Sequence, residues 1–205
     1  MSIKDLAIKQ KYIFQRDQAI IKLQFFAGDR ASDVAIILSQ EVKKLPDNNG
    51  FVFKHTFGKT LLGGSNKCNT FVIKHCDERI ICPVFALESY FSFMQNHGIP
   101  LFPGYLFRVI TESGRVLDKP VSFTSIYERF KTYLGTLGIF DGETPHSLRA
   151  GCAITLAYSE CKTDIKGIMN HVGWATEKTT QYYTRASAIK DASLVADNFA
   201  KCADK

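Results

Sequence analysis

The chain has 205 residues, of which 45% are hydrophobic, so it is long enough for one domain with a substantial core. No apolar run approaches the roughly 18 residues of a membrane span, and the N-terminus lacks the apolar stretch of a signal peptide. A net charge of +6 at pH 7 favours a polyanionic partner. We expect an intracellular protein, in the nucleus if it is eukaryotic and in the cytoplasm if it is bacterial or from a phage.

The first fifteen residues are polar, and we expect them to form an arm or a linker remnant. Periodic apolar residues predict a helix over residues 16–27, with Gly28 as its stop, and a second helix that starts at about residues 29–32. Alternating apolar and polar residues over 51–57 predict a half-buried strand.

The remaining expected elements, in chain order, are a hairpin turn at 63–66, a returning strand at 69–75, a helix from Pro83 that ends before Gly98, an extended stretch at 104–110, a helix at 124–137, and helices from Thr144 onward with breaks near 161–164 and at Gly173. This pattern predicts a mainly α fold with one small antiparallel β-sheet (α+β). We expect a single domain over residues 16–190 and a C-terminal tail at 191–205.

A histidine and an arginine open the helix that follows Thr144. Thr144 can cap this helix and Pro145 suits its first position, so His146 and Arg149 fall in the first turn. Residues three apart share a helix face, and a helix N-terminus favours a phosphate. Taken alone, the same residues also fit a capped helix with an arginine in a surface salt bridge.

A second arginine, Arg30, follows the helix stop at Gly28. Apolar neighbours at a junction between two helices can fix its guanidinium group. Two arginines give a bidentate grip on phosphate oxygens and stabilise negative charge that develops in a transition state. The alternative is that Arg30 pairs with Asp29 or Asp33 on the surface.

The only tryptophan of the chain, Trp174, precedes Tyr183 by nine residues. The indole N–H is a donor only, so Trp174 can bind a phosphate oxygen, and it can equally anchor a core. His171 is expected to stabilise a helix end. Tyr182 and Tyr183 point about 100° apart on a helix, so only one of them can face a phosphate. A phenol is a poor nucleophile at neutral pH unless arginines favour the phenolate and a histidine takes the proton.

Four strings in this order, GDRASD, TPHSLRAG, HVGW and TTQYYTR, resemble the signature of the tyrosine recombinases, also called phage integrases. The resemblance covers about residues 16–190 and implies the DNA breaking–rejoining fold of their catalytic domain. The GDRASD and HVGW strings look closest to the eukaryotic crypton-like branch. The offset from Trp174 and the TTQYYTR string select Tyr183 over Tyr182.

The resemblance also implies a role for each residue. Tyr183 would attack a backbone phosphate and form a 3′-phosphotyrosine, with its proton taken by His146 as general base. Arg30, Arg149 and Trp174 would hold the phosphate oxygens. The family places a lysine that acts as general acid on a β-hairpin, and Lys59 fits this place, with Lys67 as the alternative.

No cofactor and no metal ion are expected, and ATP is not needed because the phosphodiester energy is kept in the tyrosine ester. Double-stranded DNA is the expected partner, together with self-association as a tetramer on DNA through the C-terminal tail. Neither a membrane nor a small-molecule substrate is expected. Two alternatives remain: DNA relaxation like that of a type IB topoisomerase, and a domesticated DNA-binding protein that has kept the fold without catalysis.

Overall fold

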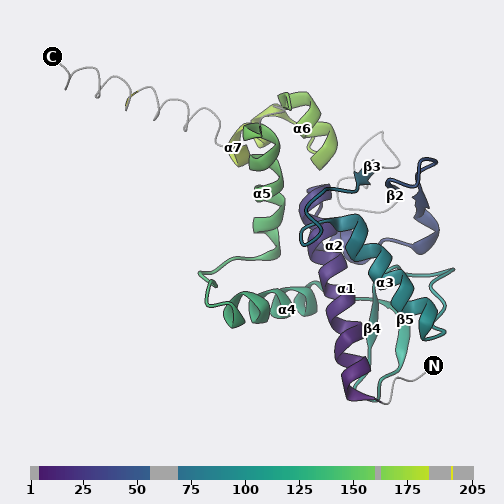
Figure 1. Cartoon of the computed structure of the whole chain (residues 1–205). Helices are drawn as coiled ribbons and strands as arrows, with labels where there is room; N and C mark the ends of the chain where they lie inside the picture. The colour runs from purple at the N-terminus through teal and green to yellow at the C-terminus, as the bar shows by residue number, and fades with distance from the viewer. Residues whose placement is uncertain (1–4, 56–68, 160–162, 185–194, 196–205) are drawn as a thin grey trace.

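The computed structural model describes residues 5–55, 69–159, 163–184 and 195, and Figure 1 shows their arrangement. In chain order the described elements are α1 (Leu6–Ala27), α2 (Ala31–Ala35), the 3-10 turn η1 (Ser39–Glu41), β1 (Val42–Lys44), β2 (Gly50–His55), β3 (Asn69–Lys74), α3 (Pro83–Asn96), β4 (Arg108–Ile110), β5 (Val116–Pro120), α4 (Phe123–Thr136), α5 (Pro145–Tyr158), α6 (Ile165–Val172) and α7 (Glu177–Thr184). The predicted fold class, mainly α with antiparallel β structure, is confirmed. None of the described helices combines the length and the apolar character that a membrane span needs.

The first helix is longer than the sequence pattern suggested. It begins at Leu6, where the Asp5 carboxylate accepts hydrogen bonds from the backbone N–H groups of Ala7 and Ile8. The expectation of an arm over residues 1–15 is therefore wrong for residues 6–15. Tyr12 is fully buried one helical repeat before the predicted start, and its hydroxyl donates to the Arg108 carbonyl at 2.8 Å. Exposed polar residues such as Gln10 and Lys11 made this segment look polar, although Tyr12 is buried and Ile8 is partly buried.

The predicted stop of this helix is confirmed. Gly28 has a φ of 62° and caps α1 in the left-handed conformation that glycine adopts at low cost. The second helix starts at Ala31, within the predicted range, and ends at Ala35. The chain thus turns sharply just after α1, and Arg30 lies in that turn.

Two small antiparallel sheets are described rather than the single one predicted. The first has the order β1-β2-β3, and its β2–β3 pairing places Phe53 opposite Phe71, with their rings stacked at a centroid distance of 4.8 Å. The second consists of β4 and β5. The sequence pattern missed β1 and β5 because strands of three to five residues give too short an alternation to recognise. The predicted hairpin turn at 63–66 lies outside the described residues.

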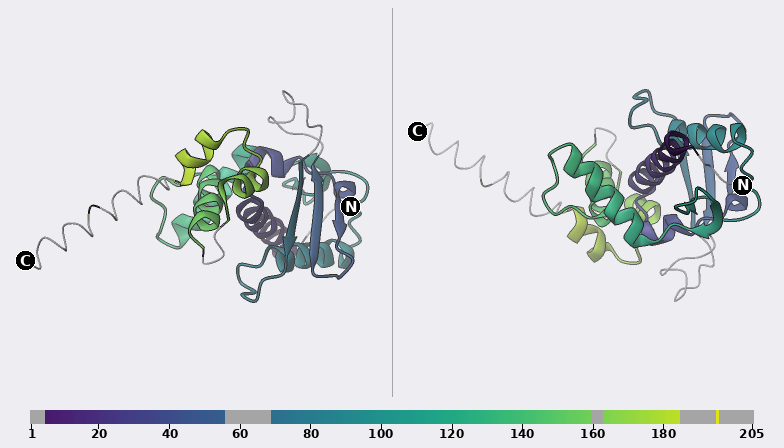
Figure 2. Two further views of the ribbon diagram at one scale, coloured as in Figure 1. Left: turned by 90° about the horizontal axis from the view of Figure 1, so that it is seen from above. Right: turned by 90° about the horizontal axis from the view of Figure 1, so that it is seen from below.

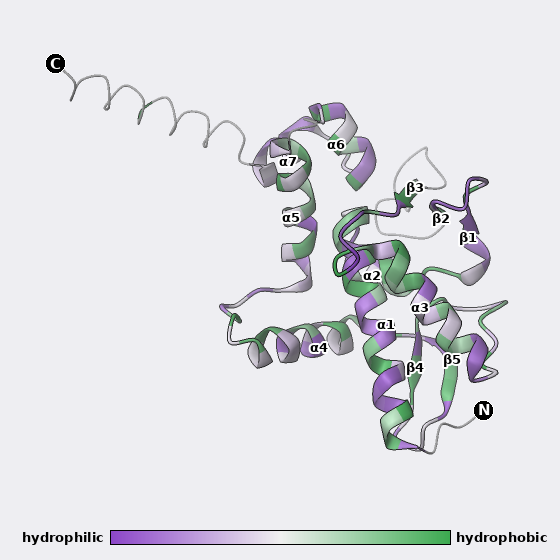
Figure 3. Ribbon diagram, viewed as in Figure 1, coloured by the Kyte–Doolittle hydropathy of each residue, from purple (hydrophilic) through white to green (hydrophobic). Residues whose placement is uncertain are grey.

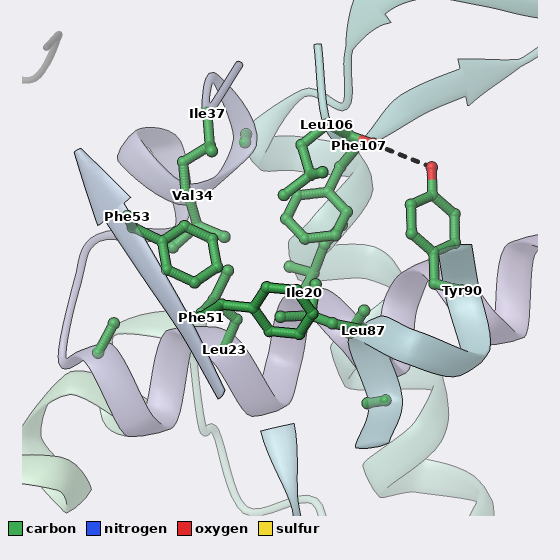
Figure 4. Close-up of a cluster of buried hydrophobic side chains, with 14 of the residues drawn as sticks. Ile20, Leu23, Val34, Ile37, Phe51, Phe53, Leu87, Tyr90, Leu106 and Phe107 are labelled. Atoms are coloured by element: carbon green, nitrogen blue, oxygen red, sulfur yellow. Dashed lines mark hydrogen bonds between the residues drawn. The ribbon is translucent and has the colours of Figure 1, made fainter. Parts of the chain in front are cut away.

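The main core lies between α1, α3 and the inner face of the three-stranded sheet. Figure 4 shows Ile20 and Leu23 of α1 packed near Leu87 of α3 and Phe51 of β2. The buried hydroxyl of Tyr90 donates to the Leu106 carbonyl at 3.0 Å, so this polar group is satisfied inside the core. Hydrophobic and hydrophilic residues are interspersed along α1 (Figure 3), and its buried residues include the polar Arg16, Asp17 and Gln24.

A network of charged side chains joins α1 to α4. The buried Asp17 carboxylate accepts hydrogen bonds from Arg16 at 2.7 Å, from Arg129 at 2.9 Å and from the Tyr133 hydroxyl at 2.8 Å. Burial, together with the charge of Asp17, raises the pKa of Tyr133 to about 12, so this phenol stays protonated and remains a donor. The network anchors the start of the second half of the chain on the first helix.

Helices α5, α6 and α7 gather at the C-terminal end of α1, on the side away from the three-stranded sheet (Figures 1 and 2). They share a smaller apolar cluster whose buried members are Cys152, Ala153, Ile168, Val172 and Trp174. The turn after α1 therefore meets the first residues of α5 and the end of α6. All the described candidate residues lie at this junction.

Candidate active site

The start of α5 carries the first pair of candidate residues. Ser147 ties the first turn by accepting a hydrogen bond from the Thr144 backbone N–H at 3.2 Å and by donating its own N–H to the Thr144 carbonyl at 2.8 Å. His146 and Arg149 lie within this turn, as the capping pattern predicted. Their surroundings differ, because His146 is exposed whereas Arg149 is only 1% exposed. The alternative that Arg149 is a surface residue is therefore wrong.

Arg149 is a buried cation whose hydrogen bonds are incomplete. Its Nη1 donates to the Gly28 carbonyl at 2.6 Å and lies 3.9 Å from Asp29 Oδ1. Its Nη2 has no hydrogen-bond partner among the described residues. Burial lowers the pKa of Arg149, and the positive charge of Arg30 lowers it further, while Asp29 acts in the opposite direction. Such a group favours an added anion, which would satisfy the donor and offset the repulsion.

Arg30 lies in the turn that follows α1. Its guanidinium group is 3.4 Å from Asp33 Oδ2, and its backbone N–H donates to Asp29 at 3.0 Å. The pairing with Asp33 that the sequence suggested is present, but the Asp33 carboxylate is buried rather than on the surface. The Arg30 side chain is 31% exposed and so retains access to solvent. Its charge lowers the pKa of both Arg149 and His146, so these three side chains are electrostatic neighbours.

Tyr183 of α7 faces His146 of α5. Its hydroxyl oxygen lies 2.6 Å from His146 Nε2. Partial burial lowers the pKa of His146, and the charges of Arg149 and Arg30 lower it further, so the neutral imidazole is favoured. With the imidazole proton on Nδ1, Nε2 accepts the hydrogen bond of the phenol. Tyr182 is 75% exposed and meets Tyr183 only ring edge to face, so the two tyrosines have different surroundings.

Trp174 forms one wall of the site. The left-handed Gly173, with a φ of 72°, ends α6, and the Trp174 backbone N–H donates to the Met169 carbonyl at 2.9 Å. The indole ring is stacked on the Tyr183 ring at a centroid distance of 4.8 Å and an interplanar angle of 17°. The Arg149 guanidinium carbon lies 5.2 Å from the centroid of the indole ring. Trp174 is thus a core residue, and its role as a phosphate donor stays a prediction.

The structure brings Arg30, His146, Arg149, Trp174 and Tyr183 together. Lys59 and its alternative Lys67 lie outside the described residues. From the sequence we expected Asp29 only as a possible surface partner of Arg30, whereas in the structure it is buried beside Arg149. An acidic residue directly after the helix-ending Gly28 was the available signal, but it became informative only once Arg149 was placed next to that turn.

Comparisons with known proteins agree with this geometry. No family model matches the chain. An integrase/recombinase XerD homolog of Selenomonas ruminantium is 27% identical over 197 residues, covering 94% of this chain and 54% of the relative. The chain therefore spans about half the length of this curated relative.

Solved structures of a recombinase and of an integrase share the fold. The XerH site-specific recombinase bound to difH substrate, in a pre-cleavage complex, matches with a TM-score of 0.61 at 18% identity, over 92% of this chain and 49% of that chain. The Tn1549 transposon integrase in complex with transposon right end DNA matches with a TM-score of 0.55 at 14% identity, over 96% of this chain and 66% of that chain. None of these comparisons tests the crypton-like branch. The chain thus has the fold of the tyrosine recombinase catalytic domain, and its sequence is similar to that of a curated recombinase.

Proposed function

We propose that the domain cleaves and rejoins DNA strands through a covalent bond to Tyr183, as part of a site-specific recombinase or integrase. The observation that carries this proposal is the 2.6 Å contact between the Tyr183 hydroxyl and His146 Nε2, next to two arginines. A phenol needs both a base for its proton and positive charge for its anion before it can attack a phosphate. This corner of the molecule offers both.

In the proposed reaction His146 accepts the phenolic proton as the Tyr183 oxygen attacks phosphorus. The bond from phosphorus to the 5′-oxygen breaks, leaving a 3′-phosphotyrosine and a free 5′-hydroxyl, and Lys59 protonates the leaving oxygen. Arg149 and Arg30 stabilise the extra negative charge on the phosphate oxygens of the transition state. A 5′-hydroxyl from another strand attacks the tyrosine ester and reverses the chemistry, so neither a metal ion nor ATP is needed.

Double-stranded DNA is the proposed substrate. The net charge of +6 suits a polyanion, and the Tn1549 integrase, which has the same fold, is in complex with transposon right end DNA. We further propose that copies of the chain assemble as a tetramer on DNA through the tail at 191–205. Deleting this tail is expected to abolish self-association measured by analytical ultracentrifugation. Unchanged association would refute that part of the proposal.

The test of the proposed activity is the capture of a protein–DNA adduct that survives SDS. The protein is incubated with duplexes nicked close to the cleavage site, so that the small fragment diffuses away and the covalent complex accumulates. The parent protein and Tyr182→Phe are expected to give the adduct, and Tyr183→Phe is expected to give none. No adduct from the parent would favour a binding protein without catalysis, and relaxation of plasmids without strand exchange would favour the topoisomerase alternative.

A further inference from the structure

The C-terminal end of α1 contacts α5, which carries His146 and Arg149, and α6, which precedes Trp174. The last carbonyl groups of a helix have no partner within it, so they are available to other side chains. Here the Gly28 carbonyl accepts from Arg149 of α5, and the Phe26 carbonyl lies 2.6 Å from His171 Nε2 of α6. One turn earlier, Gln24 Nε2 donates to the Pro145 carbonyl at 2.6 Å. One helix end therefore holds both α5 and α6.

Gln24 is buried in a way that packing does not explain. It is 0% exposed, and its Oε1 has no hydrogen-bond partner among the described residues. A buried amide that is only half satisfied costs free energy, whereas a leucine would fill a similar volume without this cost. Among the described residues, the Gln24 side chain donates to the carbonyl of Pro145, the residue directly before His146. Its location thus ties α1 to the turn that carries His146 and Arg149.

His171 makes the corresponding contact for the other segment. A carbonyl oxygen can only accept, so the proton of the imidazole lies on Nε2 and points to Phe26. Two residues later Gly173 ends α6, and Trp174 follows against the Tyr183 ring. The His171 bond therefore fixes where α6 ends relative to α1, and with it the position of the Trp174 wall.

The packing between these contacts leaves little slack. A Cβ atom added to Gly28 would lie 2.9 Å from Val172 Cγ2 and 3.1 Å from Cys152 Sγ. Both distances are shorter than ordinary contacts between side chains, so α5 and α6 approach the end of α1 as closely as a glycine allows. Packing this tight transmits a displacement of α5 or α6 to its neighbours, which include the 2.6 Å contact between His146 and Tyr183.

We propose that Gln24 and His171 are positioning residues, which hold α5 and α6 on the end of α1 and so set His146, Trp174 and Tyr183 in register for the reaction. This inference rests on the proposed function. Neither residue touches DNA or the reacting atoms in the proposed reaction. Each acts through a neighbour, Gln24 through Pro145 and His171 through the end of α6.

Three variants test the proposal in the full chain: Gln24→Leu, His171→Leu and His171→Gln, in which the amide can replace the Nε2 donor. Gln10→Leu is the matched control, because Gln10 lies exposed on the same helix. Gln24→Leu is expected to melt at the parent temperature or above it, yet to form the Tyr183 adduct about 10- to 100-fold more slowly, since small displacements of catalytic groups have effects of this size. His171→Leu is expected to show a similar loss, and His171→Gln to restore most of the rate.

A second measurement does not depend on activity. NMR titration of His146, assigned by comparison with His146→Gln, reports how far the first turn of α5 keeps that ring partly buried and near Arg30, which lies outside α5. In Gln24→Leu the pKa of His146 is expected to rise toward its ordinary value, while Gln10→Leu leaves it unchanged. If Gln24→Leu does not fold, Gln24→Met replaces it.

The outcomes separate the two proposals. An unchanged adduct rate and an unchanged His146 titration in Gln24→Leu would overturn the positioning role, as would loss of activity in His171→Gln to the level of His171→Leu. A parent protein without adduct would refute the proposed function instead. The His146 titration would then still decide whether Gln24 sets the first turn of α5.

Discussion

Sulfate has the tetrahedral geometry and negative charge of a phosphate, and it is expected to stabilise the parent protein more than the variant Arg149→Met. In the free protein the Arg149 charge is disfavoured by burial and by Arg30, and its Nη2 has no hydrogen-bond partner among the described residues. A bound anion would offset the cost of burying the Arg149 charge and screen its repulsion from Arg30. It would also accept a hydrogen bond from Nη2. Methionine keeps an unbranched, flexible apolar stem but offers neither charge nor donor.

The magnitude follows from linkage. At a sulfate concentration ten times its dissociation constant, binding stabilises the folded state by about 1.4 kcal/mol. For a chain of 205 residues, each kcal/mol corresponds to about 2–4 °C in melting temperature. The shift in the parent is therefore expected to be about 3–6 °C. Because the fold lowers the pKa of Arg149, its charge is a net cost to the free protein. In the absence of sulfate, the free energy of unfolding of Arg149→Met should therefore fall by less than the roughly 3–5 kcal/mol that is typical of a broken buried ion pair.

Thermal melting in sulfate and in chloride at matched ionic strength measures this effect. Sulfate also stabilises proteins in general by exclusion from their surface, and that contribution is common to the parent and the variant. The difference between the two sulfate-dependent shifts reports binding at Arg149. Equal shifts in both proteins would refute the inference that this arginine belongs to an anion site.

Three further changes probe the frame of the site. Gly28→Ala is expected to lower the free energy of unfolding in urea by at least about 1–2 kcal/mol, because a left-handed φ is costly for alanine and its Cβ would press on Val172; an unchanged midpoint would contradict this. Because the fold lowers the pKa of His146, the unfolded chain takes up the proton first as pH falls; the stabilising contribution is therefore present above the ordinary pKa of about 6.5 and lost below it. On acidification, the urea midpoint of His146→Gln should accordingly fall less than that of the parent. If the two midpoints fall equally with pH, His146 does not contribute to the pH dependence of stability. Asp17→Asn should lower the free energy of unfolding by about 2–4 kcal/mol. The lower end is favoured because Arg129 is partly exposed and can interact with water instead. Calorimetry measures this change, and a loss below about 1 kcal/mol would show that the network contributes little to stability.

Local rules account for what the sequence could predict. The left-handed stop at Gly28, the capped start of α5 and the left-handed end of α6 at Gly173 are all set by residues within one turn of each feature. The same rules put His146 and Arg149 in the first turn of α5. The sequence alone therefore predicted that these two side chains lie on one face of a helix. The order of the motifs then linked them to Tyr183.

Tertiary packing decides what the sequence could not predict. The burial of Arg149 and Asp29 depends on how closely α5 approaches the turn after α1, and no local pattern reports such an approach. The same holds for Gln24 and His171, whose partners lie more than a hundred residues away along the chain. The first turns of α1 were missed for a different reason, because exposed polar residues such as Gln10 and Lys11 lie between the inward-facing Ile8 and Tyr12 in the sequence.

The central claim is that the Tyr183 oxygen becomes covalently bound to DNA, and mass spectrometry of the trapped adduct tests it most directly. Trypsin would release residues Thr179–Arg185, a peptide that contains both adjacent tyrosines, and fragmentation distinguishes them. We predict that the nucleotide remnant is found on Tyr183 in the parent and in Tyr182→Phe. A remnant on Tyr182, or an adduct that persists in Tyr183→Phe, would contradict the claim.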